Sequence, residues 1–376
     1  MRIMTLTYEY PPIGGGGGVV AVALARELVR AGHEVDVVTS RLPEQPALTV
    51  DHGVRVHRHR CRRRHPHFTT AWELTSTLLP AYRTAAALIE RDPPQLIHAH
   101  FALPTGLVAL MLSRRFGIPY VLTLHGSDVP GYNPDRFRLP HWLAYPLWRR
   151  VMAGATEIVS PSEYLAGLAR KHMPAPIQIV PNGYCPGLAP QNPKRKLVLV
   201  VARLFPRKGV QHFLDAIRDL DSDWDFVVAG DGPYMQELVS RARSVRPRVR
   251  FLGFVDRETI NTLYSQARIL VFPSIQENFP MVLLEGMDAG CAVITANADG
   301  CAEVVGDTGL VVPVADPEAL RVALERLLND EVLCRQLAGR SMARATMFRW
   351  PRIAGLYMQV FADAVRWRPE LHDQVE

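Results

Sequence analysis

The sequence lacks long hydrophobic runs and paired cysteines, and each absence excludes a class of protein. No stretch reaches the roughly 18 apolar residues of a transmembrane helix. The opening MRIMTLTYEY is too short and too polar for a secretory signal and is typical of a first β-strand instead. The 5 cysteines are scattered without a CxxC pair, which favours reduced thiols in a cytoplasmic protein over disulfides or a zinc site.

Metal-binding patterns are equally scarce. His98 and His100 form an HxH pair, but LIHAH is typical of a buried strand that ends at a loop. Asp221 and Asp223 have the letters of an Asp-x-Asp motif, yet they follow a predicted helix and precede a predicted strand, so a surface turn is expected there. We therefore expect no metal and no other bound cofactor.

The chain has 376 residues, more than one hydrophobic core usually supports, so two domains are expected. Short β-branched segments alternate with longer amphipathic ones, which is the pattern of βαβ units and parallel sheets. Residues 186–196 interrupt this alternation with three prolines and three basic residues and are interpreted as a linker. The predicted fold is α/β, with two Rossmann-like domains whose parallel sheets face each other across a ligand-binding cleft.

The domain boundaries follow from this alternation. The first domain is expected to span residues 1–187 and the second residues 188–352, with a C-terminal helix over 353–376 that packs back on the first. Strands are expected in the first domain at residues 3–7, 34–39, 54–58, 95–100, 120–124, 157–160 and 178–180. In the second domain they are expected at residues 197–201, 226–229, 250–252, 269–272, 292–295 and 310–312.

Five consecutive glycines, residues 14–18, lie between the first predicted strand and the first predicted helix. They allow the backbone to approach a ligand and leave N–H groups unobstructed at a helix N-terminus. An ordinary NAD site also needs an acidic residue after the second strand, where Thr39 and Ser40 stand instead. A flexible loop without a chemical role is the alternative.

The segment VARLFPRKGV, residues 201–210, follows the first strand of the second domain. Arg203 and Lys208 lie five positions apart at a strand–loop–helix junction. Two cations together with helix-end N–H groups suit a diphosphate and need no metal to neutralise it. Basic residues that only solvate such a turn are the alternative.

A third segment, PSIQENFPMVLLEGMDAG at residues 273–290, carries two glutamates eight positions apart. Pro280 is expected in the first turn of a helix, which places Glu285 about a turn and a half into it and Glu277 in the preceding loop. A carboxylate in the loop suits the hydroxyls of a sugar, and Glu285 suits a ribose diol. Surface acids paired by chance are the alternative, but the apolar surroundings disfavour a solvated face.

Together these segments resemble the retaining GT-B glycosyltransferases of family 4, which include sucrose synthases, sucrose-phosphate synthases and mannosyltransferases. The resemblance extends over nearly the whole chain, and the joint order and spacing of its motifs make it specific. The further matching segments are GHEVDVVT, HAH followed by TLHGSDV, IVPNG, VVAGDGPY, FLGFV and GLVVPVADPEAL.

The resemblance implies a role for each matching residue. Glu285 is expected to bind the donor ribose, Arg203 and Lys208 the pyrophosphate, and Glu277 the donor sugar. His125, in LHGSD, is expected beside the reacting sugar, so that His125, Glu277, Arg203 and Lys208 form the expected catalytic set. The other expected donor-binding residues are Gly15, Gly16, Gly230, Gly253, Phe254, Val255, Asn278, Phe279 and Pro280. The expected acceptor-binding residues are Gly16, His125, Ser127 and Asp128.

The activity implied is the metal-independent transfer of a hexosyl unit from a UDP- or GDP-linked sugar to an acceptor hydroxyl, with retention of configuration. Many relatives carry glycine where Asn278 and Pro280 stand, and proline removes a backbone N–H, so the hexose stays open. A sugar-nucleotide epimerase of the same architecture and a non-catalytic sugar-nucleotide-binding protein are the alternatives.

The first half of the chain is the basic one. Residues 1–187 carry 20 Lys and Arg against 13 Asp and Glu, and much of the excess lies at residues 55–67. Arg60, Arg62, Arg63 and Arg64 precede an aromatic, leucine-containing helix with Trp72, which suits an anionic membrane surface. A lipid-linked, glycan or polyol acceptor on the inner face of a membrane is therefore expected. The alternative is a solvated loop; nucleic acid is not expected, because the aromatics are not interleaved with the arginines.

Overall fold

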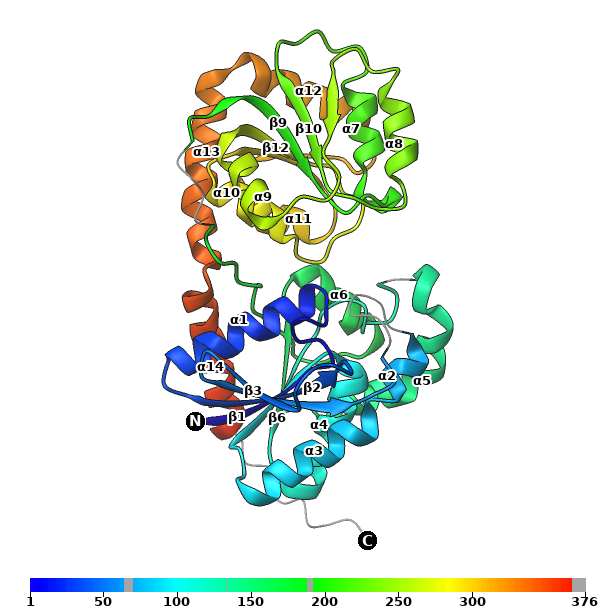
Figure 1. Cartoon of the computed structure of the whole chain (residues 1–376), viewed down its shortest axis with the longest axis vertical. Helices are drawn as coiled ribbons and strands as arrows, with labels where there is room; N and C mark the ends of the chain where they lie inside the picture. The colour runs from blue at the N-terminus through cyan, green and yellow to red at the C-terminus, as the bar shows by residue number, and fades with distance from the viewer. Residues whose placement is uncertain (64–69, 133, 188–191, 367–376) are drawn as a thin grey trace. The chain divides into compact units, whose positions relative to one another are not determined.

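The computed structural model describes residues 1–63, 70–132, 134–187 and 192–366. These residues form two compact units, and each unit alternates strands with helices (Figure 1). Unit 1 comprises Met1–Gly183 and Trp350–Glu376, and unit 2 comprises Tyr184–Arg349. Tyr184 is the first residue of unit 2, and its N–H donates to the carbonyl of Phe348 at 2.9 Å. Residues 188–191 of the expected linker lie outside the described part of the chain.

The sheet of unit 1 has the strand order β3-β4-β2-β1-β5-β6-β7-β8. Because β2 and β5 lie on opposite sides of β1, the loops after β1 and β5 diverge at the carboxyl edge, where such sheets bind ligands. The strands are β1 (Arg2–Leu6), β2 (Glu34–Arg41), β3 (Leu48–Asp51), β4 (Val54–Arg60), β5 (Leu96–His100), β6 (Tyr120–Thr123), β7 (Glu157–Ser160) and β8 (Gln178–Ile179).

One strand of unit 1 differs from the expectation of a purely parallel sheet. β3 pairs with β4 in the antiparallel sense, so this sheet is mixed. The two strands are joined by His52 and Gly53, whose φ angles of 48° and 87° are both positive, as a two-residue type I′ hairpin requires. The usual signals of such a turn are Asn-Gly and Asp-Gly, and the His-Gly pair here did not reveal the hairpin.

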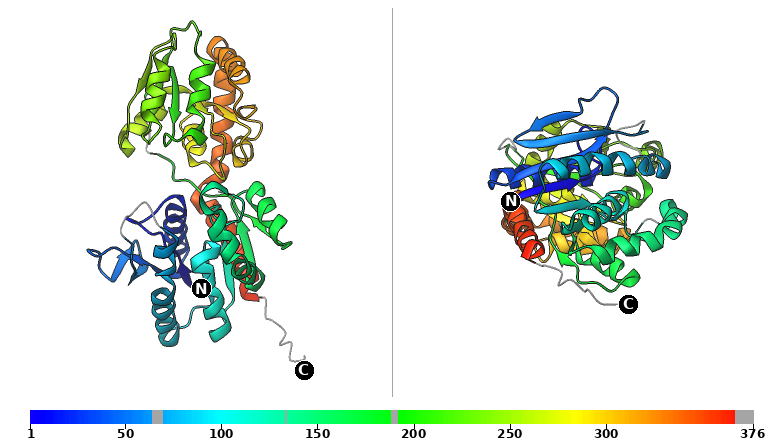
Figure 2. Two further views of the ribbon diagram at one scale, coloured as in Figure 1. Left: turned by 90° about the vertical axis from the view of Figure 1, so that its right-hand side faces the viewer. Right: turned by 90° about the horizontal axis from the view of Figure 1, so that it is seen from below.

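Helices cover both faces of the unit 1 sheet. On one face, α1 and α14 pack with Leu24, Tyr357 and Phe361 in a common core, and α14 lies beside the amino-terminal end of the chain in Figures 1 and 2. On the other face, a second core includes residues of α3, α4, α5 and α6. The helices are α1 (Gly16–Arg30), α2 (Ala71–Thr75), α3 (Leu78–Arg91), α4 (Leu107–Phe116), α5 (Pro134–Gly154), α6 (Glu163–His172) and α14 (Trp350–Arg366).

The sheet of unit 2 is parallel throughout, with the order β11-β10-β9-β12-β13-β14. The chain reverses its direction of winding between β9 and β12, which makes their carboxyl ends the expected ligand-binding edge. All six strands lie within two residues of the sequence prediction. They are β9 (Arg195–Val201), β10 (Asp225–Ala229), β11 (Val249–Phe251), β12 (Ala267–Phe272), β13 (Ala292–Ala296) and β14 (Leu310–Val312).

The helices of unit 2 also lie on both sides of their sheet and enclose two apolar cores. They are α7 (Val210–Ala216), α8 (Met235–Ala242), α9 (Arg257–Gln266), α10 (Met281–Asp288), α11 (Gly300–Val305), α12 (Pro317–Asn329) and α13 (Glu331–Ala345). In neither unit does any described helix combine the length and apolarity needed to cross a bilayer.

Candidate functional site

The loops that follow β9 and β12 are in direct backbone contact at the carboxyl edge of unit 2. The N–H of Ile275 donates to the carbonyl of Arg207 at 2.8 Å. Gly209 lies so close to the second loop that a Cβ there would be 1.8 Å from the carbonyl oxygen of Pro273. The two motifs that the sequence singled out in this domain therefore form one local site.

Lys208 and Glu277 form the centre of this site. The ammonium group of Lys208 is paired with Oε1 of Glu277, and the two side chains are only 14% and 13% exposed. The hydroxyl of Ser274 donates to the same carboxylate oxygen at 2.9 Å. Arg203 is exposed on the first loop, with its guanidinium 6.0 Å from the ring centroid of Phe205. The structure thus joins Lys208 to Glu277 and leaves Arg203 toward solvent.

Glu285 lies on α10, and the start of this helix differs from the sequence prediction. Pro280 is the N-cap residue, with φ −80° and ψ 109°, rather than a residue of the first turn. Its extended backbone conformation puts it outside the helix, which begins at Met281. Glu285 is consequently the fifth helical residue, so its side chain still lies about a turn above the Glu277 loop.

Both carboxylate oxygens of Glu285 are bound by residues of α9. Oε1 accepts from Arg257 at 2.6 Å, and Oε2 accepts from the hydroxyl of Tyr264 at 3.0 Å. Tyr264 is buried, whereas the Arg257 side chain is 57% exposed. Burial, followed by the charge of Glu285, raises the pKa of Tyr264 well above its ordinary value. Tyr264 is thus a fixed donor, and Arg257 is a surface partner.

The loop that holds Glu277 is fixed by the first residue of α11. The N–H of Gly300 donates to the carbonyl of Glu277 at 3.1 Å, and a Cβ at Gly300 would be 1.7 Å from the carbonyl oxygen of Asn278. Asn278 and Phe279 are buried, and the ring centroid of Phe279 lies 5.8 Å from that of Phe348. Contacts with Gly300 and Phe348 therefore fix the backbone of residues 277–279.

The loops after β10 and β11 carry the remaining expected donor-binding residues of unit 2. The N–H of Gly230 donates to the carbonyl of Gly253 at 2.9 Å, which ties the two loops together. Phe254 follows with its side chain 84% exposed, and Val255 is half-buried. An exposed aromatic ring beside two backbone loops offers a flat apolar surface to a ligand.

The five glycines of unit 1 have two structural roles: some allow close packing against other residues, and others leave the backbone exposed. Gly15 caps α1 and donates its N–H to Oε2 of Glu9 at 3.1 Å. A Cβ at Gly17 would be 2.4 Å from the ring of Phe101, whereas nothing lies within 4 Å of a Cβ at Gly16. Gly15 and Gly16 are exposed, so these two positions present backbone that a ligand can reach.

His125 follows β6 and contacts two residues at the end of β5. Its Nε2 lies 2.9 Å from Nδ1 of His100, and its ring centroid is 4.4 Å from that of Phe101. Burial lowers the pKa of His125 to about 3, so the ring is neutral at physiological pH. The sequence predicted His125 as a site residue and did not predict His100 as its partner.

Asp128 joins the same two loops through its carboxylate. Oδ1 accepts from the N–H of His125 at 2.9 Å, and Oδ2 accepts from the N–H of Ala102 at 2.8 Å. Burial raises the pKa of the Asp128 carboxyl despite these donors. Ser127 beside it is half-buried. The contacts of Asp128 fix the position of His125, a task that the sequence had not distinguished from acceptor binding.

Among the described residues, no group of three or more His, Cys, Asp or Glu side chains is arranged so that it could hold a metal ion. His98 and His100 lie in a strand whose five residues are all buried, so the interpretation of LIHAH as a buried strand is confirmed. Asp221 and Asp223 lie in the turn before β10 with side chains 81% and 70% exposed.

Two family models match the chain in succession. The model described as Glycosyltransferase Family 4 matches residues 14–186, and the model described as Glycosyl transferases group 1 matches residues 189–343. Together they cover the five glycines of unit 1 and all the candidate site residues of unit 2.

The chain is a family 4 glycosyltransferase with the GT-B fold.

Relatives of this glycosyltransferase match it over most of their length. An uncharacterised glycosyltransferase of Methanocaldococcus jannaschii is 29% identical, with 88% of this chain and 90% of the relative covered. The glycogen synthase of Mycobacterium tuberculosis is 28% identical, with 97% and 95% covered. Among solved structures, the sucrose-phosphate synthase of Thermosynechococcus elongatus is similar, with a TM-score of 0.78, 24% identity, and 96% and 99% covered.

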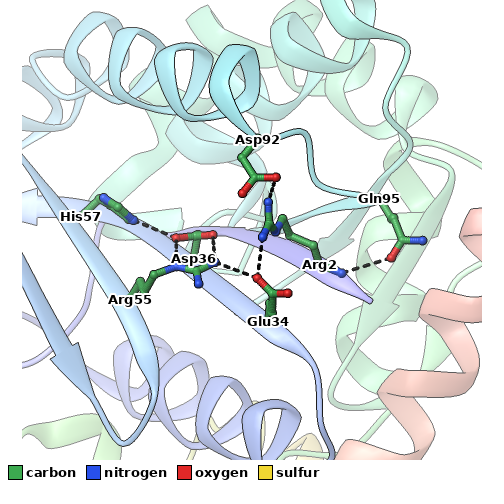
Figure 3. A network of polar contacts seen from close by, with 7 residues as sticks. All are labelled: Arg2, Glu34, Asp36, Arg55, His57, Asp92 and Gln95. Carbon is green, nitrogen blue, oxygen red and sulfur yellow. Dashed lines mark hydrogen bonds and ion pairs between the residues drawn. The ribbon is translucent and has the colours of Figure 1, made fainter.

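Part of the basic segment of the glycosyltransferase is paired with acidic residues within unit 1. Figure 3 shows Arg55 and His57 of β4 directed at Asp36 of β2, at 2.6 and 2.8 Å. Burial alone would raise the pKa of the Asp36 carboxyl, but the hydrogen bonds from Arg55 and His57 outweigh burial and hold it well below its usual range. His59 is buried, and burial lowers its pKa to about 4.

The expected membrane-facing arginines need one correction. Arg63 is buried and donates to the carbonyl of Tyr8 at 3.2 Å, so it does not belong to an exposed basic surface. Arg60 and Arg62 are exposed, and the guanidinium of Arg62 lies 5.8 Å from the ring centroid of Trp72. Arg64 lies outside the described residues. Alternation along β4 and the loop after it turns some of these side chains inward, which composition alone did not reveal.

Proposed function

We propose that this glycosyltransferase moves a hexosyl unit from a UDP- or GDP-linked sugar onto an acceptor hydroxyl. The observation that carries the proposal is the largely buried Lys208–Glu277 pair at the switch point between β9 and β12. A cation and a carboxylate held together there suit a diphosphate and the hydroxyls of a sugar. The structurally similar Anabaena protein HepE, with a TM-score of 0.73 and 20% identity, was solved with UDP and glucose, which supports the proposed donor class.

In this proposal the donor ribose takes the place of Arg257 on Glu285. The Arg257 side chain is 57% exposed, and exposed ion pairs contribute only about 0–1 kcal/mol, so the exchange costs little. Tyr264 keeps its bond to Oε2 and holds the carboxylate in place. Phe254 and the joined loops at Gly230, Gly253 and Val255 would then approach the nucleoside.

The diphosphate leaves with developing negative charge, which Lys208 and Arg203 are placed to stabilise. A well-placed donor of this kind contributes about 3 kcal/mol to transition-state stabilisation. Lys208 would turn from Glu277 toward the phosphate, and Glu277 would accept hydrogen bonds from the sugar beside Asn278, Phe279 and Pro280. Two cations in these positions supply the charge neutralisation without a metal.

We propose a retaining, front-face course for the transfer. The acceptor oxygen bonds to the anomeric carbon on the face from which the phosphate oxygen departs, and the departing phosphate takes the acceptor proton. A double displacement needs a free carboxylate nucleophile at that carbon. Glu277 is a poor candidate, because Ser274 binds its Oε1 and its proposed role is to accept hydrogen bonds from the sugar hydroxyls. On unit 1, His125 and the exposed Gly15 and Gly16 are the groups proposed to act on the sugar.

The acceptor is proposed to be a glycan, a polyol or a lipid-linked sugar that unit 1 binds. Arg60 and Arg62 are exposed, and Trp72 beside Arg62 is 68% exposed. Exposed arginines next to an amphipathic aromatic ring favour the interface of an anionic membrane. We therefore favour a lipid-linked acceptor and a peripheral position on the inner face of a membrane.

The donor is tested by thermal-shift measurements with UDP-, GDP- and ADP-linked sugars. A matching donor at a hundredfold its Kd should stabilise the protein by about 2.7 kcal/mol. Glu285→Gln should lose this stabilisation, and Glu258→Gln, a matched change on the exposed face of α9, should keep it. Nucleotide diphosphate should then be released only when an acceptor is present. Near-normal binding and turnover by Glu285→Gln would contradict the proposed donor site.

The membrane surface is tested by sedimentation with anionic phospholipid vesicles. Each arginine near such a surface contributes about 1 kcal/mol, so replacing Arg60 and Arg62 by Gln should weaken binding roughly thirtyfold at low salt. The matched control replaces Arg83 and Arg91, which are exposed on α3. Equal binding by both double variants across a salt series would reject the membrane surface and leave the sugar transfer untouched.

A further inference from the structure

Three histidines of unit 1 lie in a row, and the proposed reaction uses only one of them. His98 and His100 share one face of β5, because side chains two positions apart along a strand point the same way, and both are fully buried. Their ring centroids are 4.3 Å apart, and the ring centroid of His100 is 5.2 Å from that of His125. The HxH pair therefore reaches the proposed catalytic histidine directly.

The bond between His100 and His125 couples their protons. A neutral imidazole has one N–H and one bare nitrogen, so one ring must donate and the other accept. Both rings are neutral, because burial lowers the pKa of His125 to about 3 and holds that of His100 well below its ordinary value. With 2.9 Å between Nδ1 of His100 and Nε2 of His125, the tautomer of one ring fixes the tautomer of the other.

The second nitrogen of His100 decides which ring donates. Nε2 of His100 is buried and has no hydrogen-bond partner among the described residues. If His100 accepted at Nδ1, its proton would lie on Nε2 as a buried N–H without an acceptor, a group that folded proteins rarely contain. If His100 donates from Nδ1, no buried N–H is left unpaired on this ring. The second arrangement is the favoured one.

The surroundings keep the two rings from rotating. Asp128 binds the backbone N–H of His125, and the ring of Phe101 packs against the His125 ring. On the other side, His98 is covered by Phe361 of α14, with ring centroids 5.0 Å apart. A single arrangement of the histidine row is therefore maintained by packing from β6, from the loop after β5 and from α14.

We propose that His100 is a positioning residue that donates from Nδ1 to Nε2 of His125 and so fixes the proton of His125 at Nδ1. With its proton there, His125 presents a hydrogen-bond donor to an oxygen of the sugar or of the departing phosphate, and Nδ1 is not a base. His98 has a different partner, because its Nε2 bonds the Thr123 hydroxyl at 2.9 Å. The catalytic role of this tautomer rests on the proposed function, whereas the assignment of the tautomer rests only on the hydrogen bonding of His100 and His125.

The tautomer is measured by long-range 1H–15N correlation NMR of the full chain labelled with 15N-histidine. The His125 signals are assigned by their loss in His125→Gln. The wild-type protein should show a protonated Nδ1 and a bare Nε2 on His125. His100→Leu should disturb this pattern, and His100→Asn should restore it, because the amide nitrogen of Asn takes nearly the position of Nδ1. His98→Gln is the matched control and should leave His125 unchanged.

The kinetic measurement separates positioning from folding. His100→Leu should lower kcat by roughly tenfold to a hundredfold, by analogy with the loss seen when the hydrogen-bond partner of a metal-binding histidine is removed. The donor KM should change little, and His100→Asn should recover most of the loss. A protonated Nε2 on His125 in the wild-type protein would overturn the inference, even if His100→Leu failed to fold. The inference would also be overturned if a folded His100→Leu variant showed the same His125 tautomer as the wild-type protein. If no donor is turned over, the proposed function fails while the NMR result still decides the tautomer.

Discussion

Tyr264 shows at the scale of single residues how a buried donor sets the geometry of a site carboxylate. Its hydroxyl binds Oε2 of Glu285, and its ring is 2% exposed. Because its pKa is raised well above the ordinary value, the hydroxyl keeps its proton and donates throughout the physiological pH range. Glu285 is thereby oriented with Oε1 toward Arg257, or toward a ribose in the proposed complex.

Removing this hydroxyl should weaken nucleotide binding without affecting the fold. A hydrogen bond to a charged group contributes about 1.5–3 kcal/mol, so Tyr264→Phe should raise the Kd for the matching nucleotide diphosphate at least about tenfold in isothermal titration calorimetry. Tyr145→Phe is the matched control, because Tyr145 donates to the carbonyl of His172 in unit 1. A Kd equal to that of the wild-type protein would show that Tyr264 does not orient Glu285.

The sequence named candidate site residues but few of their structural partners. Glu277 and Glu285 were predicted because a motif and a family resemblance mark them. Arg257 was missed, since it stands 28 positions before Glu285 and has no motif of its own. Lys208 and Glu277 are 69 positions apart, and only the packing of two loops brings them together. Such pairings depend on tertiary distances that local patterns do not encode.

At the scale of elements, the carboxyl edge of unit 2 is built by loops that touch through glycine. Gly300 is the clearest case, because any side chain there meets the backbone of Asn278. The glycine gives its N–H to Glu277 and leaves room for the loop that carries this carboxylate. The start of α11 thus helps to determine where the candidate site residue Glu277 lies.

Gly300→Ala should destabilise unit 2 and displace the Glu277 loop. Overpacking of this kind costs about 1–3 kcal/mol, which urea unfolding followed by circular dichroism will detect. The control is Gly339→Ala in α13, where a Cβ meets nothing within 4 Å and should raise the free energy of unfolding by about 0.5–1 kcal/mol. Equal stabilities of the two variants would contradict the described contact.

Element positions were predicted well where the hydrophobic period is regular. The strands of unit 2 are buried apolar runs, and their limits agree with the prediction within two residues. β3 was missed because its burial alternates between half-buried and exposed and its turn is His-Gly. Pro280 was placed one position too far inside α10, since proline is common both before and within the first turn.

At the scale of the whole molecule, some of the basic side chains in the first half of the chain are paired locally with acidic ones. Arg2, Arg55 and His57 converge on Glu34, Asp36 and Asp92 at the amino end of the unit 1 sheet (Figure 3). The network links β1, β2 and β4 with the end of α3. The position of a basic residue in the sequence therefore does not tell whether its charge faces a partner or is paired within the unit.

The stability of the molecule should depend on Asp36 at neutral pH and less so in acid. Its pKa is lower in the folded protein than the ordinary value of about 4, so the folded state binds fewer protons. The resulting stabilisation is complete above about pH 5 and is lost as the pH falls through 4 toward the folded-state pKa. Asp36→Asn should lower the free energy of unfolding by about 1–2 kcal/mol at pH 7, with the gap narrowing at pH 3.

Urea unfolding at a series of pH values measures this dependence. Asp92→Asn is the matched control, because the side chain of Asp92 is 56% exposed and its pair with Arg2 should contribute about 0–1 kcal/mol. If the gap between Asp36→Asn and the wild-type protein stayed constant from pH 7 to pH 3, the proposed linkage would be incorrect.

The ion pairs of unit 2 affect how donor binding should depend on ionic strength. Lys208 is neutralised by Glu277 and Arg257 by Glu285 before any ligand arrives. A donor that replaces one partner by another exchanges ion pairs and releases few mobile counterions from the protein. Its affinity should therefore fall only gently with added salt, unlike that of an open basic pocket. In the proposed complex, recognition would then depend on the shape and hydroxyls of the donor as well as on its charge.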